Sequence, residues 1–177
     1  MDDIRAQPTI DGVDTVPLRK RRLQARTSHI VAATPLTLQE LKKLLVARGF
    51  EIYRTLPASV ALVERVRENL ILDSGIRVSV TPTGFKVRVI FRAEGRGFPG
   101  ETEDQRLGRA QALSNQATVD GFWALDQQVV PQMDPSHPDV ELDRFYEVAC
   151  EREVHSLDDV EPILRKAFEW LRSVPAA

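Results

Sequence analysis

Residues 76–93, IRVSVTPTGFKVRVIFRA, carry the strongest structural signal in the chain. On both sides of a turn at residues 81–84, apolar residues alternate with polar ones; the apolar set is Ile76, Val78, Val80, Phe85, Val87, Val89 and Phe91. A period of two places alternate side chains on opposite faces of a strand. Two such runs joined by a Pro-Thr-Gly turn are typical of a hairpin. We therefore predict a β-hairpin with one apolar face that needs cover.

The other face of the predicted hairpin is basic. It carries four cations and no anion, namely Arg77, Lys86, Arg88 and Arg92. One interpretation is a docking surface for an acidic protein or for nucleic acid. The other is that Glu147 and Glu151, on the polar side of a predicted strand at 145–152, offset part of the charge. Exposed ion pairs of this kind contribute only about 0–1 kcal/mol each.

Length and composition indicate one ordinary globular domain. The chain has 177 residues, of which 42% are hydrophobic and 28% charged, as in soluble proteins. A net charge of −2 means that attraction to nucleic acid or membrane has to be local. The start, Met-Asp-Asp-Ile, does not resemble a secretory signal, and no apolar run reaches the length of a membrane helix. Cys150 is the only cysteine, which excludes an internal disulfide. We expect a cytoplasmic protein.

Residues 1–35 differ from the rest and are predicted to form a flexible arm. An acidic opening precedes a cluster of cations, Arg19, Lys20, Arg21, Arg22 and Arg26, and prolines interrupt any regular period. The arm could keep the protein soluble, bind a partner protein, or neutralise phosphates of nucleic acid or a membrane surface. The apolar segment 29–33 that follows could add a strand to a sheet edge in this chain or another.

Residues 36–175 are predicted to form the folded domain. Thr37 and Glu40 fit a capping box that starts a helix, which Gly49 ends, and residues 50–55 suit a strand. Pro57 is predicted to open a second helix with Val60, Val63, Val66 and Leu70 on one face, which Asp73-Ser74-Gly75 ends. An alternative makes residues 70–72 a short strand that turns into Ile76.

The second half begins with an irregular loop at 95–100. Thr102 is predicted to cap a long helix that bends at Asp120-Gly121 and continues to about residue 129. A loop at 131–138, the strand at 145–152 and a last helix follow. Ser156 caps this helix, although Pro162 suggests a start near Glu161. The residues Trp123, Phe168, Trp170 and Cys150 are interpreted as core.

This order of elements predicts an α+β fold. The middle six elements match the split βαββαβ arrangement of ferredoxin-like folds, a two-layer structure with a four-stranded antiparallel sheet and here with extra N- and C-terminal helices. In its strand order, 4-1-3-2, the last strand is not adjacent to the hairpin. Glu147 and Glu151 would then neutralise the basic face incompletely.

Two loops offer candidate sites. The loop at 95–100 lacks the Lys-Ser/Thr of a phosphate-binding loop, and Glu101, Glu103 and Asp104 oppose an anion at the following helix. Arg96 and Phe98 could instead meet a partner. The loop at 134–139 gathers two carboxylates and His137, but the other histidines are far away in sequence and turns commonly use these residues. We predict no metal and no cofactor.

The sequence contains few signs of catalysis: it has no nucleophile elbow, no His-Glu-x-x-His motif and no base near Cys150 in sequence. We therefore predict a non-enzymatic adaptor or regulatory subunit that binds a protein partner through the basic arm and the basic sheet face. The predicted architecture is analogous to that of small chaperone-like dimers that hold a client segment on their surface. A homodimer is therefore one possible assembly. One alternative is a nucleic-acid-associated protein that uses Arg19–Arg26 as a phosphate clamp. Another is a small enzyme with a site near Gly95–Gly100.

Overall fold

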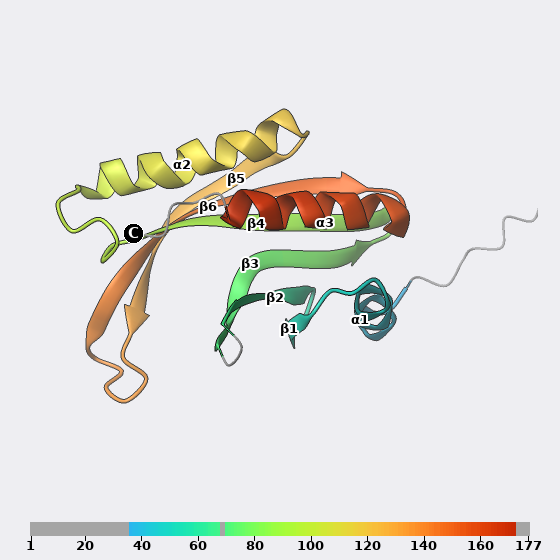
Figure 1. Ribbon diagram of the computed structural model, residues 1–177, viewed down its shortest axis with the longest axis horizontal. Coiled ribbons are helices and arrows are strands. Elements are labelled where there is room, and N and C mark those ends of the chain that lie inside the picture. The colour runs from blue at the N-terminus through green and yellow to red at the C-terminus, as the bar shows by residue number, and fades with distance from the viewer. Residues whose placement is uncertain (1–35, 68–69, 173–177) are drawn as a thin grey trace, which may run out of the picture. The chain divides into compact units, whose positions relative to one another are not determined.

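The computed structural model describes residues 36–67 and 70–172. Within them the chain forms three helices and six strands. Their order is α1 (Leu38–Ala47), β1 (Ile52–Thr55), β2 (Val60–Arg67), β3 (Leu70–Thr81), β4 (Gly84–Glu94), α2 (Glu103–Val119), β5 (Trp123–Met133), β6 (Glu141–Val154) and α3 (Leu157–Arg172) (Figure 1). The predicted arm lies outside the described residues.

The strands form a single antiparallel sheet in the order β1-β2-β3-β4-β6-β5. The α+β class and the antiparallel sheet are confirmed. The four-stranded ferredoxin-like order is wrong, because two segments predicted as helix are strands. These segments are the one after Pro57, which forms β2, and the one after Gly121, which forms β5.

β2 is a strand because it is buried on both sides. Val60, Ala61 and Leu62 are fully buried and Val63 nearly so, whereas a helix on the surface of a sheet buries only one stripe. Its valines also favour the extended backbone. The alternative strand at residues 70–72 is confirmed, since β3 begins at Leu70.

The helix caps predicted from sequence are present. Thr37 and Glu40 form the capping box of α1, and the amide of Asp159 donates to Ser156 Oγ at 3.2 Å. α3 nevertheless starts at Leu157 rather than near Glu161. Pro162 lies in its second turn, where the missing amide costs one bond to the carbonyl of Asp158.

The end of α2 corrects a further prediction. At Gly121, φ is 78°, and this left-handed residue terminates the helix instead of bending it. The chain then enters β5, so Trp123 is 43% exposed rather than core. Trp170 and Cys150 are buried as predicted, while Phe168 packs partly buried at the edge of the core.

The helices of the described residues pack on one face of the sheet. Residues of α1, α2 and α3 join one cluster with alternate residues of the strands, including Val60, Leu62, Ile76, Val78, Val87, Val89, Phe91, Val148 and Cys150. In Figure 1, α2 and α3 run along β4 and β6, and α1 lies beside β1. The hairpin and its buried apolar face are confirmed. Because side chains alternate, the polar set lies on the opposite face, which we call the open face.

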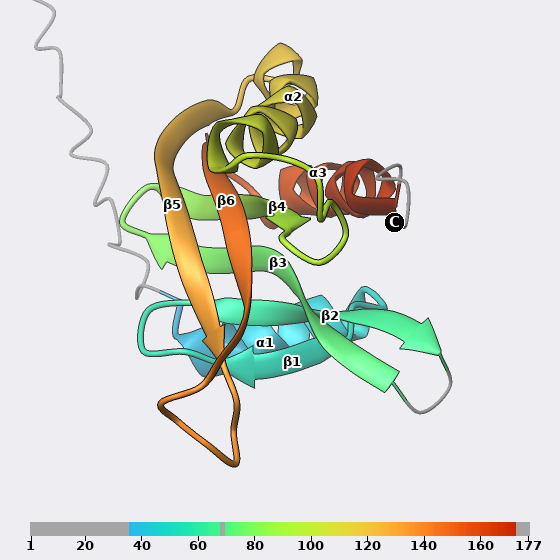
Figure 2. The same ribbon diagram turned by 90° about the vertical axis from the view of Figure 1, so that its left-hand side faces the viewer.

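The β2–β3 hairpin and the β5–β6 hairpin both extend beyond β4, the strand that lies between them in the sheet (Figure 2). β3 pairs with β4 only from Ile76 onward, and its earlier residues pair with β2 alone. A bulge makes this bend: residues 74–76 stand opposite the single residue Leu62. Gly75 has φ 82°, and a Cβ there would lie 2.8 Å from the Ile90 carbonyl oxygen. At the other hairpin, residues 141–144 of β6 pair only with β5.

Candidate functional site on the open face

One row of side chains crosses the whole sheet on the open face. Directly opposed residues of neighbouring strands share a face, and the register connects Arg54, Ala61, Arg77, Arg88, Glu151 and Trp123 from β1 to β5. We call these six residues the central row. It places three of the chain's arginines and an exposed indole on one line.

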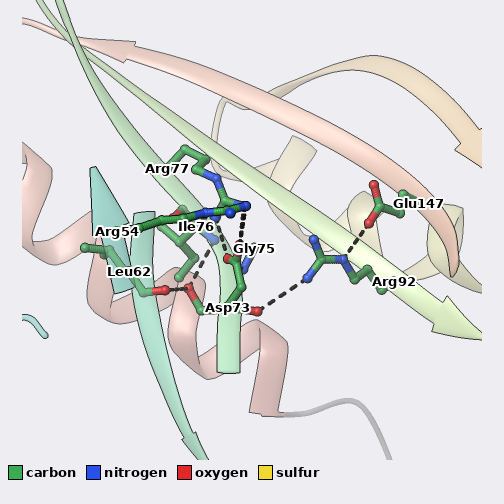
Figure 3. Close-up of polar contacts among 9 residues, drawn as sticks. Arg54, Leu62, Asp73, Gly75, Ile76, Arg77, Arg92 and Glu147 are labelled. Carbon is green, nitrogen blue, oxygen red and sulfur yellow. Dashed lines mark hydrogen bonds and ion pairs between the residues drawn. The ribbon is translucent and has the colours of Figure 1, made fainter. Parts of the chain in front are cut away.

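Asp73 neutralises the two arginines in the first half of the row, Arg54 and Arg77 (Figure 3). Both terminal nitrogens of Arg77, Nη1 and Nη2, donate to the Asp73 carboxylate at 2.6 Å, and Arg54 lies 3.9 Å from it. The bulge makes this possible, because the Gly75 amide also donates to Asp73 at 2.9 Å. Burial disfavours the charged carboxylate, but these bonds and the charges of Arg77 and Arg92 outweigh it, so the pKa of Asp73 is lowered.

Glu147 connects four strands through a second set of bonds. Arg92 Nε donates to its carboxylate at 2.6 Å, and Gln128 Nε2 donates to its other oxygen at 2.8 Å. Arg92 also donates to the carbonyl of Asp73 at 3.4 Å, as Figure 3 shows. Glu147 is only 5% exposed. A buried carboxylate needs such partners, so this set is part of the fold.

Arg88 has fewer hydrogen-bond partners than Arg77 and Arg92. Its Nη1 lies 3.6 Å from Glu151, beyond hydrogen-bond distance, and the same carboxylate lies 3.3 Å from Lys86 Nζ. Arg88 Nε is buried and has no hydrogen-bond partner among the described residues. Arg88 also stands directly opposite Arg77, a like-charge pair that costs free energy.

The adjacency of β6 to β4 corrects the expected charge of the hairpin face. Glu147 and Glu151 lie directly opposite Arg92 and Arg88 instead of on a distant strand, so neutralisation is more extensive than predicted. The carboxylates lie inside: the side chains of Glu147 and Glu151 are 7% and 12% exposed. The side chains of Arg88 and Lys86 are 35% and 33% exposed. Arg88 and Lys86 are therefore more exposed than the two buried glutamates beside them.

The loop residues predicted to meet a partner are engaged within the chain. Arg96 Nη2 donates to the Leu142 carbonyl at 2.7 Å. Phe98 lies under the Arg109 guanidinium, 4.2 Å from the ring centroid. The five cations predicted as partner contacts in the arm, Arg19, Lys20, Arg21, Arg22 and Arg26, lie outside the described residues.

Sequence reasoning missed two residues of this face, Asp73 and Trp123. Asp73-Ser74-Gly75 was interpreted as a helix end, although Asp before Ser-Gly also suits a bulge that turns a strand. Trp123 follows Asp120-Gly121, a pair that equally marks the end of a helix. In both cases the predicted helix continued into residues that form a strand, β3 in the first case and β5 in the second.

Two surface hollows lie on the helix side of the sheet. One, of about 570 Å³, is lined by residues that include Phe50, Val63 and Phe168. The other, of about 520 Å³, includes Phe122, Arg152 and Trp170. Neither is lined by the 95–100 loop. Among the described residues, no group of three or more His, Cys, Asp or Glu side chains is placed to hold a metal ion.

Burial raises the pKa of the Cys150 thiol, which a hydrogen bond to Ser114 only partly counters. A buried, protonated thiol is a poor nucleophile. No helix within the described part of the chain has the length and apolar character to cross a membrane.

Searches against protein-family models, curated proteins and solved structures find no match.

Proposed function

We propose that this protein is a non-enzymatic adaptor or regulatory subunit that binds a partner protein on the open face of its sheet. The observation that carries the proposal is the one-sided cover of the sheet. Within residues 36–67 and 70–172, all three helices pack on one face, and the other presents the central row with Arg88 and Trp123 partly exposed.

The side chains of this face suit binding better than proton transfer. A general acid or base works best with a pKa near the operating pH. The pKa of Asp73 is lowered by its bonds to Arg77 and Gly75 despite burial, so it stays ionised and holds the arginines in place. Rows of fixed charge at the rim of an interface give specificity and association rate.

Site-specific photo-crosslinking in cells tests the proposal. A benzoylphenylalanine at Ser79, which lies opposite Lys86 on the open face, should link a discrete partner. The matched control is the same residue at Gln116, an exposed position of α2. The captured protein is then purified and tested for binding to the wild type and to a Trp123→Glu variant.

The proposal predicts a partner linked from position 79 and not from 116, with direct binding lost in Trp123→Glu. Equal crosslinks from both positions, or purified proteins that bind the variant unchanged, would contradict it.

A further inference from the structure

We propose that the open face receives an acidic, extended segment of a protein partner, with a carboxylate at Arg88 and Lys86 and an aromatic or apolar side chain on Trp123. This inference rests on the proposed function and adds the chemistry of the partner and the residues that select it.

The first argument is the unmet hydrogen-bonding capacity of Arg88. Two cations, Arg88 and Lys86, share the carboxylate of Glu151, and only Lys86 has a second carboxylate nearby, that of Glu153 at 4.0 Å. Arg88 Nε has no partner within the part of the chain that the structure describes. A planar guanidinium matches a carboxylate with two parallel bonds. Nε itself is closed to solvent, but the Arg88 side chain is 35% exposed, so an added carboxylate would bind its terminal nitrogens and relieve the repulsion between Arg88 and Arg77.

The second argument is the overall charge of the face. Its ion pairs include five cations (Arg54, Arg77, Lys86, Arg88 and Arg92) and four carboxylates (Asp73, Glu147, Glu151 and Glu153). Glu94, opposite Phe145 on the same face, adds a fifth carboxylate, so the face has no net charge. A neutral face with an incompletely paired arginine suits one isolated carboxylate better than a polyanion. A nucleic-acid strand carries a phosphate on every nucleotide, so its neighbouring phosphates would meet Glu153, whose side chain is half exposed.

The third argument is the position of Trp123 in the same row. Trp123 and Arg88 both lie opposite Glu151, on β5 and β4. Strands in a sheet are about 4.8 Å apart, so the two residues stand about 10 Å apart, which an extended peptide spans in about three residues. Trp123 is 43% exposed. A segment that crosses the strands with an acidic residue and an aromatic residue three positions later fits both.

Fluorescence anisotropy with the full-length protein tests this chemistry. The probe is a labelled, capped peptide that repeats Glu-Glu-Ser-Tyr. Three comparison probes are a Lys-Lys-Ser-Tyr repeat, a Glu-Glu-Ser-Ser repeat and an oligothymidylate of similar charge. The variants are Arg88→Gln, Arg88→Lys and Trp123→Ala. Arg165→Gln, an exposed arginine of α3, is the matched control.

The expected result is binding of the Glu-Glu-Ser-Tyr peptide that weakens about tenfold in Arg88→Gln and stays unchanged in Arg165→Gln. Arg88→Lys should fall between these, because it keeps the charge and loses the paired bonds. Trp123→Ala should weaken the tyrosine peptide about fivefold and leave the Glu-Glu-Ser-Ser repeat unaffected. Thermal melting establishes that each variant is folded, and Lys86→Gln replaces any variant that is not.

Three outcomes would overturn the inference: equal affinity of Arg88→Gln, tighter binding of the oligothymidylate than of the peptide, or no binding of any peptide. The crosslinking experiment separates this failure from that of the proposed function. A partner still linked from position 79 and lost in Trp123→Glu would keep the function and reject the acidic segment.

Discussion

A carboxylate that is as buried as Glu147 lowers stability unless cations and donors meet it. Arg92 and Gln128 supply both, and Arg92 in turn reaches the backbone of Asp73. Charge reversal at Arg92 is therefore expected to disturb folding as well as binding. Arg88, with its loose contact to Glu151, is the position at which binding can be changed with less effect on the fold.

Arg92→Met should lower the free energy of unfolding by about 2 kcal/mol, because Glu147 then keeps only one neutral partner in a buried site. Urea unfolding measures this. The double variant Arg92→Met/Glu147→Gln should recover most of the loss, since no uncompensated charge remains. Additive losses in the double variant would show that the two side chains do not act as a pair.

Asp73 gives a pH dependence whose sign follows from its lowered pKa. The ordinary value is 3.8 and the folded value lies below it. The stabilisation is therefore fully present above the unfolded pKa and is lost as pH falls through the folded pKa. The free energy of unfolding should fall less for Asp73→Asn than for the wild type between about pH 5 and pH 3. Parallel stability curves would contradict this assignment.

At the scale of elements, the bulge in β3 decides where the sheet bends and where Asp73 points. Residues 74–76 face Leu62 alone, and the Ser74 hydroxyl donates to the Leu62 carbonyl at 2.9 Å. A regular strand would continue along β4 and turn Asp73 out of reach of Arg77. The bulge thus links backbone geometry to the charge of the open face.

Gly75→Ala should lower the free energy of unfolding by about 2–3 kcal/mol, because it adds a clash with the Ile90 carbonyl to the cost of a left-handed backbone. Gly49→Ala is the matched control. Its φ is 84°, but no atom lies within 4 Å of the added Cβ, so the loss there should be about 1 kcal/mol. Equal losses, measured by urea unfolding, would mean that the close approach to β4 does not matter.

At the scale of the whole molecule, the described core draws on every helix and on four of the strands, from Leu41 to Trp170. The open face needs all six strands of the described residues, because the central row takes one residue from each. Exposed residues of the open face, such as Arg88 and Trp123, are therefore expected to affect binding more than stability, whereas the buried Arg92–Glu147 pair contributes to the fold.

Deletion of residues 1–33 should leave the melting temperature nearly unchanged, because the sequence of the arm offers no periodic apolar face. If the arm adds a contact to the partner, as its cations Arg19–Arg22 and Arg26 suggest, the deletion should weaken capture of the crosslinked protein. Differential scanning fluorimetry and a binding assay with the purified partner check the two parts. A large drop in melting temperature would show that the arm belongs to the fold.

The sequence by itself determined the elements whose signals are local. Alternation placed the β3–β4 hairpin and its buried side, and side-chain caps placed the starts of α1 and α2, because hydrogen bonds and periods act over a few residues. The cations of the open face were also visible, since alternation alone assigns them to one side. The apolar residues of β2 fit a helical stripe as well as a buried strand, so local pattern did not decide between them.

Only the tertiary structure decided which strand lies beside β4. That neighbour is β6, and it places Glu147 and Glu151 against Arg92 and Arg88. Strand order depends on long-range pairing. The segment after Pro57 is a buried strand between β1 and β3, and the segment after Gly121 is an edge strand that pairs with β6 alone. The charge balance of the face follows from that order, because ion pairs form between residues that are far apart in sequence and adjacent in the sheet.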